Sequence, residues 1–132
     1  MKKAFTIIEL VFVIVALGIL AMVATPRLVS SKEDAEITRV KSEIAAIRSA
    51  IQTYRGANLL AQKPGSGYPD DLKTTTIEEI TNGTKLGSNW EVSEDGKTLT
   101  LRIGETTIFT YDNSTGRLTC PNTDTLCGKI EK

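Results

Sequence analysis

Apolar residues are concentrated near the start of the chain. From Phe5 to Ala24 only Thr6 and Glu9 interrupt an apolar run, whereas the residues after Thr25 are mixed or polar. Twenty helical residues at about 1.5 Å each cover about 30 Å, which is the thickness of the hydrocarbon core of a bilayer. The pattern therefore predicts a helix that can span a membrane.

A short basic leader, Met1 to Ala4 with Lys2 and Lys3, precedes this run. Basic residues beside a spanning helix tend to stay on the cytoplasmic side of the membrane. We therefore expect a single-pass protein whose bulk lies outside the cytoplasm.

Two ordinary interpretations of the apolar run compete with a specialised one. A secretory signal peptide is cut after its apolar region at a small-x-small site, but a cut after Ala24 would place Met22 at the outer small position, with Pro26 close behind. An ordinary membrane anchor explains the length but not Glu9, because an acidic side chain costs roughly 2.5 to 3.5 kcal/mol at mid-bilayer and less near the interface. Glu9 therefore needs an explanation of its own.

A second helical pattern follows Pro26. Its apolar residues are spaced alternately by three and four, at Ile37, Val40, Ile44, Ile47, Ile51 and Tyr54. The spacing predicts an amphipathic helix, and because it lasts under three heptads, packing on the protein's own sheet is favoured over a coiled coil. With the apolar run it predicts one long, bent helix from about Phe5 to about Arg55, ended by Gly56 and Asn58.

The rest of the chain has loop and strand patterns. Residues 56–88 are rich in turn residues and contain one short helical segment, Thr76 to Ile80. Segments rich in β-branched and aromatic residues predict strands at Trp90 to Ser93, Lys97 to Ile103, Thr106 to Tyr111 and Arg117 to Cys120. The expected fold class is α+β, with one long N-terminal helix packed on a small antiparallel sheet of three to four strands.

Composition limits the chemistry that the chain can perform. Its 132 residues suffice for one modest domain, and 16 basic residues balance 16 acidic ones. No histidine is present, which removes the commonest general base and metal ligand. We therefore expect no enzyme and no cofactor, and the charge balance gives no indication of DNA binding.

The N-terminal residues from Lys2 to Leu10, which read KKAFTIIEL, resemble the start of type IV prepilins and of type II secretion pseudopilins. The resemblance covers about the first quarter of the chain and implies a type IV pilin-like fold. It also implies that a prepilin peptidase cuts between Ala4 and Phe5 and methylates the new amine of Phe5. The family usually has glycine before the cut, and Ala4 departs from that pattern.

Three further residues match assembly positions of this family. Glu9 is the glutamate at the fifth mature position, and Gly18 and Pro26 fall where pilins carry a helix-weakening glycine and a proline. Both residues disfavour a regular helix, and the resemblance implies that residues 18–26 unwind in the filament; a simple kink is the alternative. The charged Phe5 amine of a neighbouring subunit can reach Glu9 and neutralise it.

Together, the residue patterns and the resemblance lead us to expect three parts in the chain. Residues 1–4 are a cleaved leader, residues 5–26 the transmembrane and assembly half of the helix, and residues 27–132 an extracytoplasmic head. The head comprises the amphipathic half of the helix, the loop 56–88, the sheet 89–120 and a C-terminal cystine loop 120–127.

Cys120 and Cys127 would lie outside the cytoplasm in this topology, so we expect a disulfide between them. Two free thiols are the alternative. A zinc site is disfavoured because two sulfurs are too few ligands and histidine is absent.

The expected function is that of a structural subunit, of a minor or competence type, in a type IV pilus-like filament. The expected location is the bacterial inner membrane, with the head in the periplasm, and then the filament. Its partners would be other pilins or pseudopilins, the prepilin peptidase, the inner-membrane assembly platform and membrane lipid. The alternatives are the major pseudopilin of a type II secretion system and a membrane-anchored binding module. Major pseudopilins typically bind calcium in a C-terminal loop, and four residues here are candidate oxygen ligands: Asp112, Asn113, Asn122 and Asp124.

Overall fold

The computed structural model describes residues 4–132, together with the side chains of all of these except residues 24–31. Residues 1–3, which belong to the predicted leader, lie outside the described part. Contacts divide the chain into two units, residues 1–35 and residues 36–132, and each is described by itself.

One helix, α1 (Ile7–Leu60), runs from the first unit into the second. In the first unit its large apolar side chains up to Val23 are exposed, and in the second a stripe on one face is buried. Gly18 and Pro26 both lie within its helical backbone. Within residues 4–132, no helix is both long enough and apolar enough to cross a membrane.

The predicted end of the long helix was wrong. We expected Gly56 and Asn58 to end it, but α1 continues to Leu60. Gln62 adopts a left-handed backbone conformation with φ 53°, and its N–H donates to Leu59 O while that of Lys63 donates to Asn58 O. These two bonds form a Schellman motif that satisfies the last carbonyls of the helix. Asn58 stays in the helix because its buried side chain donates to Gly67 O at 3.0 Å.

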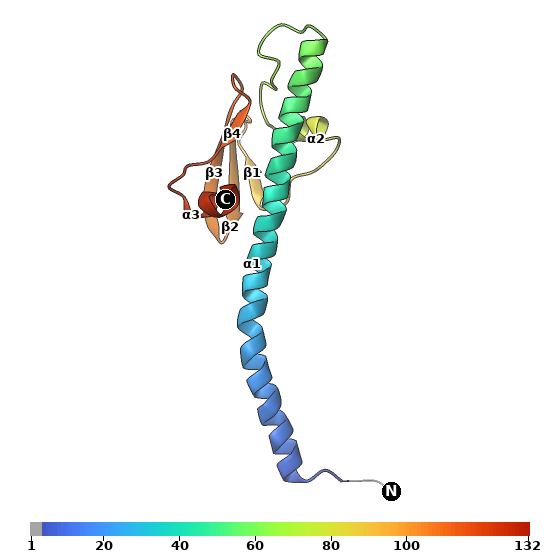
Figure 1. Cartoon of the computed structure of the whole chain (residues 1–132), viewed down its shortest axis with the longest axis vertical. Coiled ribbons are helices and arrows are strands. Elements are labelled where there is room, and N and C mark those ends of the chain that lie inside the picture. The colour runs from blue at the N-terminus through green and yellow to red at the C-terminus, as the bar shows by residue number, and fades with distance from the viewer. Residues whose placement is uncertain (1–3) are drawn as a thin grey trace. The chain divides into compact units, whose positions relative to one another are not determined.

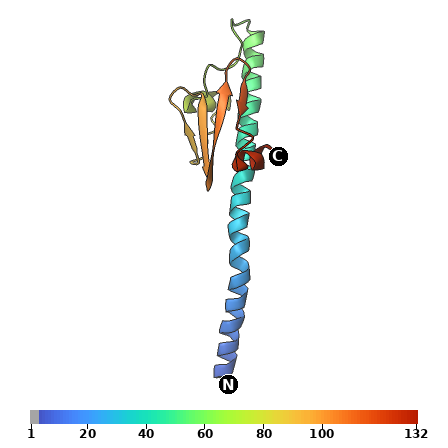
Figure 2. The ribbon, with the colours of Figure 1, turned by 90° about the vertical axis from the view of Figure 1, so that its left-hand side faces the viewer.

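The second unit contains a meander of four antiparallel strands, and Figure 2 shows them in the order β1-β2-β3-β4. Their bounds are β1 (Trp90–Val92), β2 (Thr98–Ile103), β3 (Glu105–Asp112) and β4 (Arg117–Thr119). Each strand matches a predicted one to within one residue at either end. The expected α+β, pilin-like fold is therefore confirmed.

Two short helices complete the head. Helix α2 (Thr74–Ile80) begins two residues before the predicted helical segment, and α3 (Thr125–Glu131) occupies part of what we expected to be a loop. Figure 1 shows α1 and α2 on the same side of the sheet.

The core lies between α1 and one face of the sheet. The face of β2 and β3 that points to α1 is buried, whereas residues between these positions are more exposed. The predicted helix stripe is buried at Val40, Ile44, Ile47 and Ile51, and only partly buried at Ile37 and Tyr54. The core is completed by side chains from the sheet, the loops and α3, including Leu72, Ile77, Leu99, Leu101, Phe109, Tyr111, Leu118, Leu126 and Ile130. The stripe is therefore core, as its spacing predicted.

Candidate functional site

The start of α1 holds Glu9 in a reciprocal cap. The backbone N–H of Glu9 donates to Thr6 Oγ1 at 3.3 Å, and the backbone N–H of Thr6 donates to Glu9 Oε2 at 2.9 Å. This capping box satisfies two N–H groups at the helix start. The sequence signal for this cap is Thr-x-x-Glu, and our prediction for Glu9 did not include Thr6.

The two residues flanking the predicted cut precede the helix. Ala4 and Phe5 have no regular secondary structure, and both are exposed. The backbone nitrogen of Phe5 is adjacent in sequence to the Thr6 N–H that Glu9 already binds. An amine created at Phe5 would therefore arise one residue away from a carboxylate that is already held at the helix start.

A continuous apolar surface follows Glu9. Each large apolar side chain between Phe5 and Val23 is exposed, from 50% at Val13 to 86% at Phe5. A Cβ atom placed on Gly18 would meet no atom within 4 Å among the described residues. Soluble monomers rarely expose apolar patches of this extent, so the surface indicates contact with lipid or with other proteins.

A disulfide joins the end of the sheet to α3. The structure pairs Cys120 with Cys127, whose Cα atoms are 6.0 Å apart. The buried Thr107 on β3 donates its hydroxyl to Asp124 Oδ2 at 2.9 Å, just before α3 begins. Leu126 and Ile130 of α3 enter the core. The segment after β4 is thus a helix that covers one end of the core.

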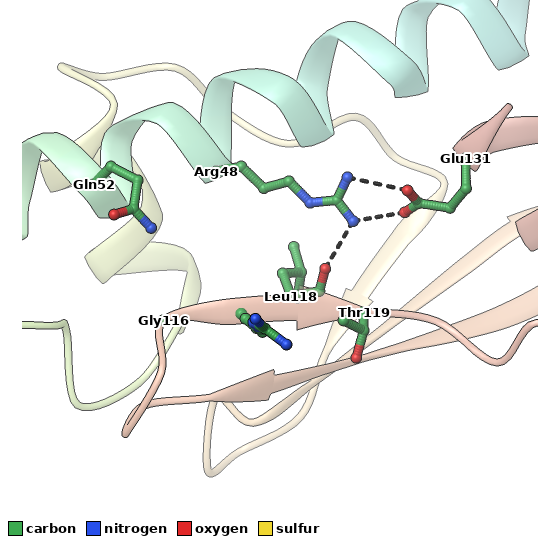
Figure 3. Close-up of a pocket in the computed structure, with 7 residues that line it drawn as sticks. Arg48, Gln52, Gly116, Leu118, Thr119 and Glu131 are labelled. Carbon is green, nitrogen blue, oxygen red and sulfur yellow. Dashed lines mark hydrogen bonds and ion pairs between the residues drawn. The ribbon is translucent and has the colours of Figure 1, made fainter.

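Arg48 ties α3 and β4 to the long helix (Figure 3). Its guanidinium binds both carboxylate oxygens of Glu131, at 2.6 and 3.2 Å, and also donates to Leu118 O at 2.7 Å. Beside it lies an open cavity of about 310 Å³, lined by Arg48, Gln52, Gly116, Arg117, Leu118, Thr119 and Glu131.

The four candidate calcium ligands do not converge. Asp112 ends β3, where its carboxylate accepts bonds from Ser114 and Thr115, whereas Asp124 binds Thr107 near the opposite end of the same strand. Five residues of extended chain separate those ends by about 17 Å. Within residues 4–132 there is also no group of three or more acidic or cysteine side chains that could hold a metal ion.

Three aspartates fix turns at one end of the sheet. Each accepts hydrogen bonds from side-chain hydroxyl and backbone N–H groups nearby, and these bonds hold its pKa below the ordinary value. The hydroxyl donor with the largest effect is Thr76 for Asp71, Ser93 for Asp95 and Ser114 for Asp112. These carboxylates are local structural acceptors.

The fold and the helix start define the class of this protein as pilin-like, because one long helix carries an exposed apolar segment with a capped glutamate at its start and continues into a unit built on a four-stranded sheet. The chain is 32% identical over 106 residues to the type IV narrow pilus major component PilA5 of Thermus thermophilus, covering 80% of this chain and 84% of the relative. It is 31% identical over 126 residues to the type II secretion system core protein G of Dickeya chrysanthemi, covering 83% of this chain and 76% of the relative.

A similar match spans 61% of the length of the type II secretion system core protein G of Pseudomonas aeruginosa, at 32% identity and over 72% of this chain. No family model and no solved structure matches. The chain belongs to the type IV pilin and type II secretion pseudopilin family, and it is a structural subunit of that family. Relatives of this kind are structural subunits rather than enzymes.

Proposed function

We propose that this chain is cut between Ala4 and Phe5 by a prepilin peptidase, methylated at the new amine, and then polymerised through the N-terminal part of α1 into a pilus-like filament. The observation that carries the proposal is the exposed apolar surface from Phe5 to Val23, interrupted at its start by a carboxylate that is hydrogen-bonded at 2.9 Å. Such a surface requires lipid before assembly and neighbouring helices after it.

The charge on Glu9 favours pairing between subunits. Cleavage converts the Phe5 amide nitrogen into an ammonium group, and N-methylation retains its positive charge. In an apolar environment an unpaired carboxylate is far more costly than a paired one, so the Phe5 amine of a neighbouring subunit stabilises the filament when it reaches Glu9. The same contact sets the axial register of neighbouring helices.

Before assembly we place the subunit in the bacterial inner membrane. Residues 5–24 are long enough to span the hydrocarbon core, and Lys2 and Lys3 favour a cytoplasmic N-terminus with the head in the periplasm. Other pilins or pseudopilins, the peptidase, the assembly platform and membrane lipid are then its partners. Gly18 and Pro26 are the positions where we propose that α1 unwinds within the filament.

The major pseudopilin of a type II secretion system is the second candidate. The similarity to core protein G of two bacteria favours it. The coverage of 84% of the Thermus pilus component favours a pilus subunit. Isolation of the filament distinguishes the two, because a pilus extends beyond the cell surface.

Replacement of Glu9 by alanine tests the assembly role. We expect Glu9→Ala to insert into the membrane but to enter filaments at least about 100-fold less than the wild type. The reason is that the charged Phe5 amine of the neighbouring subunit is then buried without its partner. Glu36→Ala is the matched control, since Glu36 is an exposed acidic residue of the same helix outside the apolar segment. Normal assembly of the Glu9 variant would contradict the role of this carboxylate.

Two further measurements separate the proposal from a membrane-anchored binding module. Mass spectrometry of the mature protein should find an N-terminal methylated Phe5, and Ala4→Leu should block the cut. Exchange of residues 5–24 for an unrelated spanning segment should abolish assembly, whereas a binding module would keep its function.

A further inference from the structure

Arginines gather on the head where α1 meets β4. Arg48 and Arg55 are seven residues apart on α1, which is about two helical turns, and so they lie near one face of the helix. Arg117 belongs to β4 and lines the same cavity as Arg48 and Gln52. We call Arg48, Gln52, Arg55 and Arg117 the arginine seam.

Tyr68 joins the two ends of this seam. The Arg55 guanidinium stacks over the Tyr68 ring, 4.7 Å from its centroid, and Tyr68 in turn packs against the backbone of Gly116 beside Arg117. The buried Nε of Arg55 has no hydrogen-bond partner within the described chain. The stack therefore holds Arg55 close to the start of β4.

The seam keeps an excess of positive charge. Arg48 is neutralised by Glu131, with which it forms an ion pair of 2.6 Å. Neither Arg55 nor Arg117 forms an ion pair within residues 4–132. Arg117 lines the open cavity of about 310 Å³ and lies opposite Asp112 in the sheet, but the Asp112 carboxylate accepts its bonds from Ser114 and Thr115. Arg117 at the cavity and Arg55 beside Tyr68 therefore remain as cationic groups for a partner.

The opposite lateral edge of the head is acidic. Residues 73–97, which comprise α2, β1 and the turn after β1, carry five acidic side chains and three basic ones, Lys73, Lys85 and Lys97. Lys73 forms an ion pair with Asp71 at 3.4 Å, so the balance of this edge stays acidic. Glu79 and Glu94 are exposed, and neither forms an ion pair within the described residues. Glu94 lines one surface cavity together with Lys73 and the first residues of α2, so the turn and the helix are neighbours. We call Glu78, Glu79, Glu94 and Asp95 the acidic edge.

The two surfaces lie on opposite sides of one sheet. β1 and β4 are its outer strands, separated by three strand spacings of about 4.8 Å, or about 14 Å in total. Figure 2 shows β1 and α2 toward one lateral edge and β4 toward the other. A contact between two different surfaces of identical copies is heterologous, and such contacts build open helical filaments when the rotation does not close a ring.

We propose that the arginine seam of one subunit receives the acidic edge of a second copy of this chain. The inference rests on the proposed filament function and names the head surfaces that neighbouring subunits use. Opposite charges on the two edges align the heads side by side and disfavour pairing of like edges.

Charge reversal in the full-length chain, expressed with its assembly system, tests this contact. Arg117→Glu, and separately the pair Glu79→Arg with Glu94→Arg, should each lower the yield of filaments about tenfold, because like charges then face each other. All three positions are exposed, so the reversals should leave the fold intact. Combining the reversals of both surfaces should restore most of the yield.

Lys63→Glu and Glu105→Lys are the matched controls, since both residues are exposed and lie outside the two surfaces. We expect their filament yields to equal that of the wild type. The amount of each subunit in membranes, and its disulfide state, show that the variant has folded.

The proposal is overturned if the reversals leave the yield unchanged, or if the combined variant assembles no better than either parent. Loss of filaments from Arg117→Glu without rescue would point to another anionic partner, such as a nucleic acid, and would also reject the contact. These results differ from failure of the proposed function, in which the wild-type chain forms no filament or Glu9→Ala assembles normally.

Discussion

Gly116 is a residue on which the packing of Tyr68 and Arg55 directly depends. Its φ of 67° lies in the left-handed region, and a Cβ atom at this position would overlap the Tyr68 ring. The guanidinium of Arg55 stacks on the same Tyr68 ring. One glycine therefore permits the close packing of the loop before α2, the turn before β4 and the long helix.

A matched pair of glycine variants should separate backbone strain from the overlap of side chains. Gly104 has a similar φ of 64°, but a Cβ atom there would meet nothing within 4 Å. We expect Gly104→Ala to cost about 1 to 2 kcal/mol through the left-handed backbone alone, and Gly116→Ala to cost about 1 to 3 kcal/mol more. Denaturant unfolding of the two variants measures this difference, and equal losses would contradict the packing of Tyr68 on Gly116.

Tyr111 should make the head sensitive to alkali. Burial raises the pKa of its phenol to about 12, and its hydroxyl donates to Pro69 O at 2.8 Å. Because the folded pKa lies above the unfolded value of about 10, the stabilisation is complete below pH 10 and is lost as the pH rises toward 12.

Unfolding at a series of pH values tests this dependence. The denaturant concentration at the midpoint of unfolding should decrease for the wild type as the pH is raised from 10 to 12. For Tyr111→Phe this midpoint should decrease less steeply over the same range. At neutral pH the same variant should lose about 1 kcal/mol, because the Pro69 carbonyl loses its donor. If Tyr111→Phe lost stability with rising pH as steeply as the wild type, the alkaline sensitivity would have to come from other groups.

At the scale of elements, the strands were predictable and the helix ends were not. Alternation in β2 and β3 and the turns between strands placed all four strands to within one residue. The end of α1 depends instead on Asn58, whose side chain bonds to Gly67, and on a left-handed Gln62. Neither contact can be read from local propensity, which favoured a stop at Gly56.

In the candidate site, too, features with a local sequence signal were predictable and features that depend on distant contacts were not. Sequence pattern and family resemblance identified Glu9 and the apolar run, because their signals are local. The short helix α3 was missed, since its apolar positions, Leu126, Cys127 and Ile130, span barely more than one turn. Its burial depends on contacts with distant residues such as Thr107.

The disulfide should contribute measurably to the stability of this last helix. Cys120 and Cys127 are seven positions apart, and closing so short a loop in the unfolded chain corresponds to about 2.5 kcal/mol in the chain-entropy model. We expect the double variant Cys120→Ala, Cys127→Ala to lose about that amount in denaturant unfolding. Reductant should lower the stability of the wild type and leave that of the double variant unchanged.

At the scale of the whole molecule, every buried apolar side chain that the structure describes lies within residues 36–132. The first of these along the chain is Val40. The two units therefore differ in kind, because one is stabilised by its own packing and the other exposes its apolar side chains.

A protein comprising residues 36–132 should consequently fold by itself. We expect it to remain monomeric, to unfold cooperatively and to form the Cys120–Cys127 disulfide. Ile51→Ala in this protein should cost about 2 to 5 kcal/mol, because Ile51 is fully buried. Circular dichroism and sedimentation provide the measurements, and a disordered fragment would show that residues before 36 contribute to the fold.

The order of the elements along the chain also determines which apolar surfaces are exposed during synthesis. The ribosome completes the helix stripe from Val40 to Ile51 before it makes β2 and β3, which cover that stripe. At about 5 to 20 residues per second, the 60 residues between Ile51 and Tyr111 take about 3 to 12 s. For those seconds the nascent chain carries an uncovered apolar stripe in addition to its apolar N-terminus, and so it depends on chaperones or on a lipid surface to avoid aggregation.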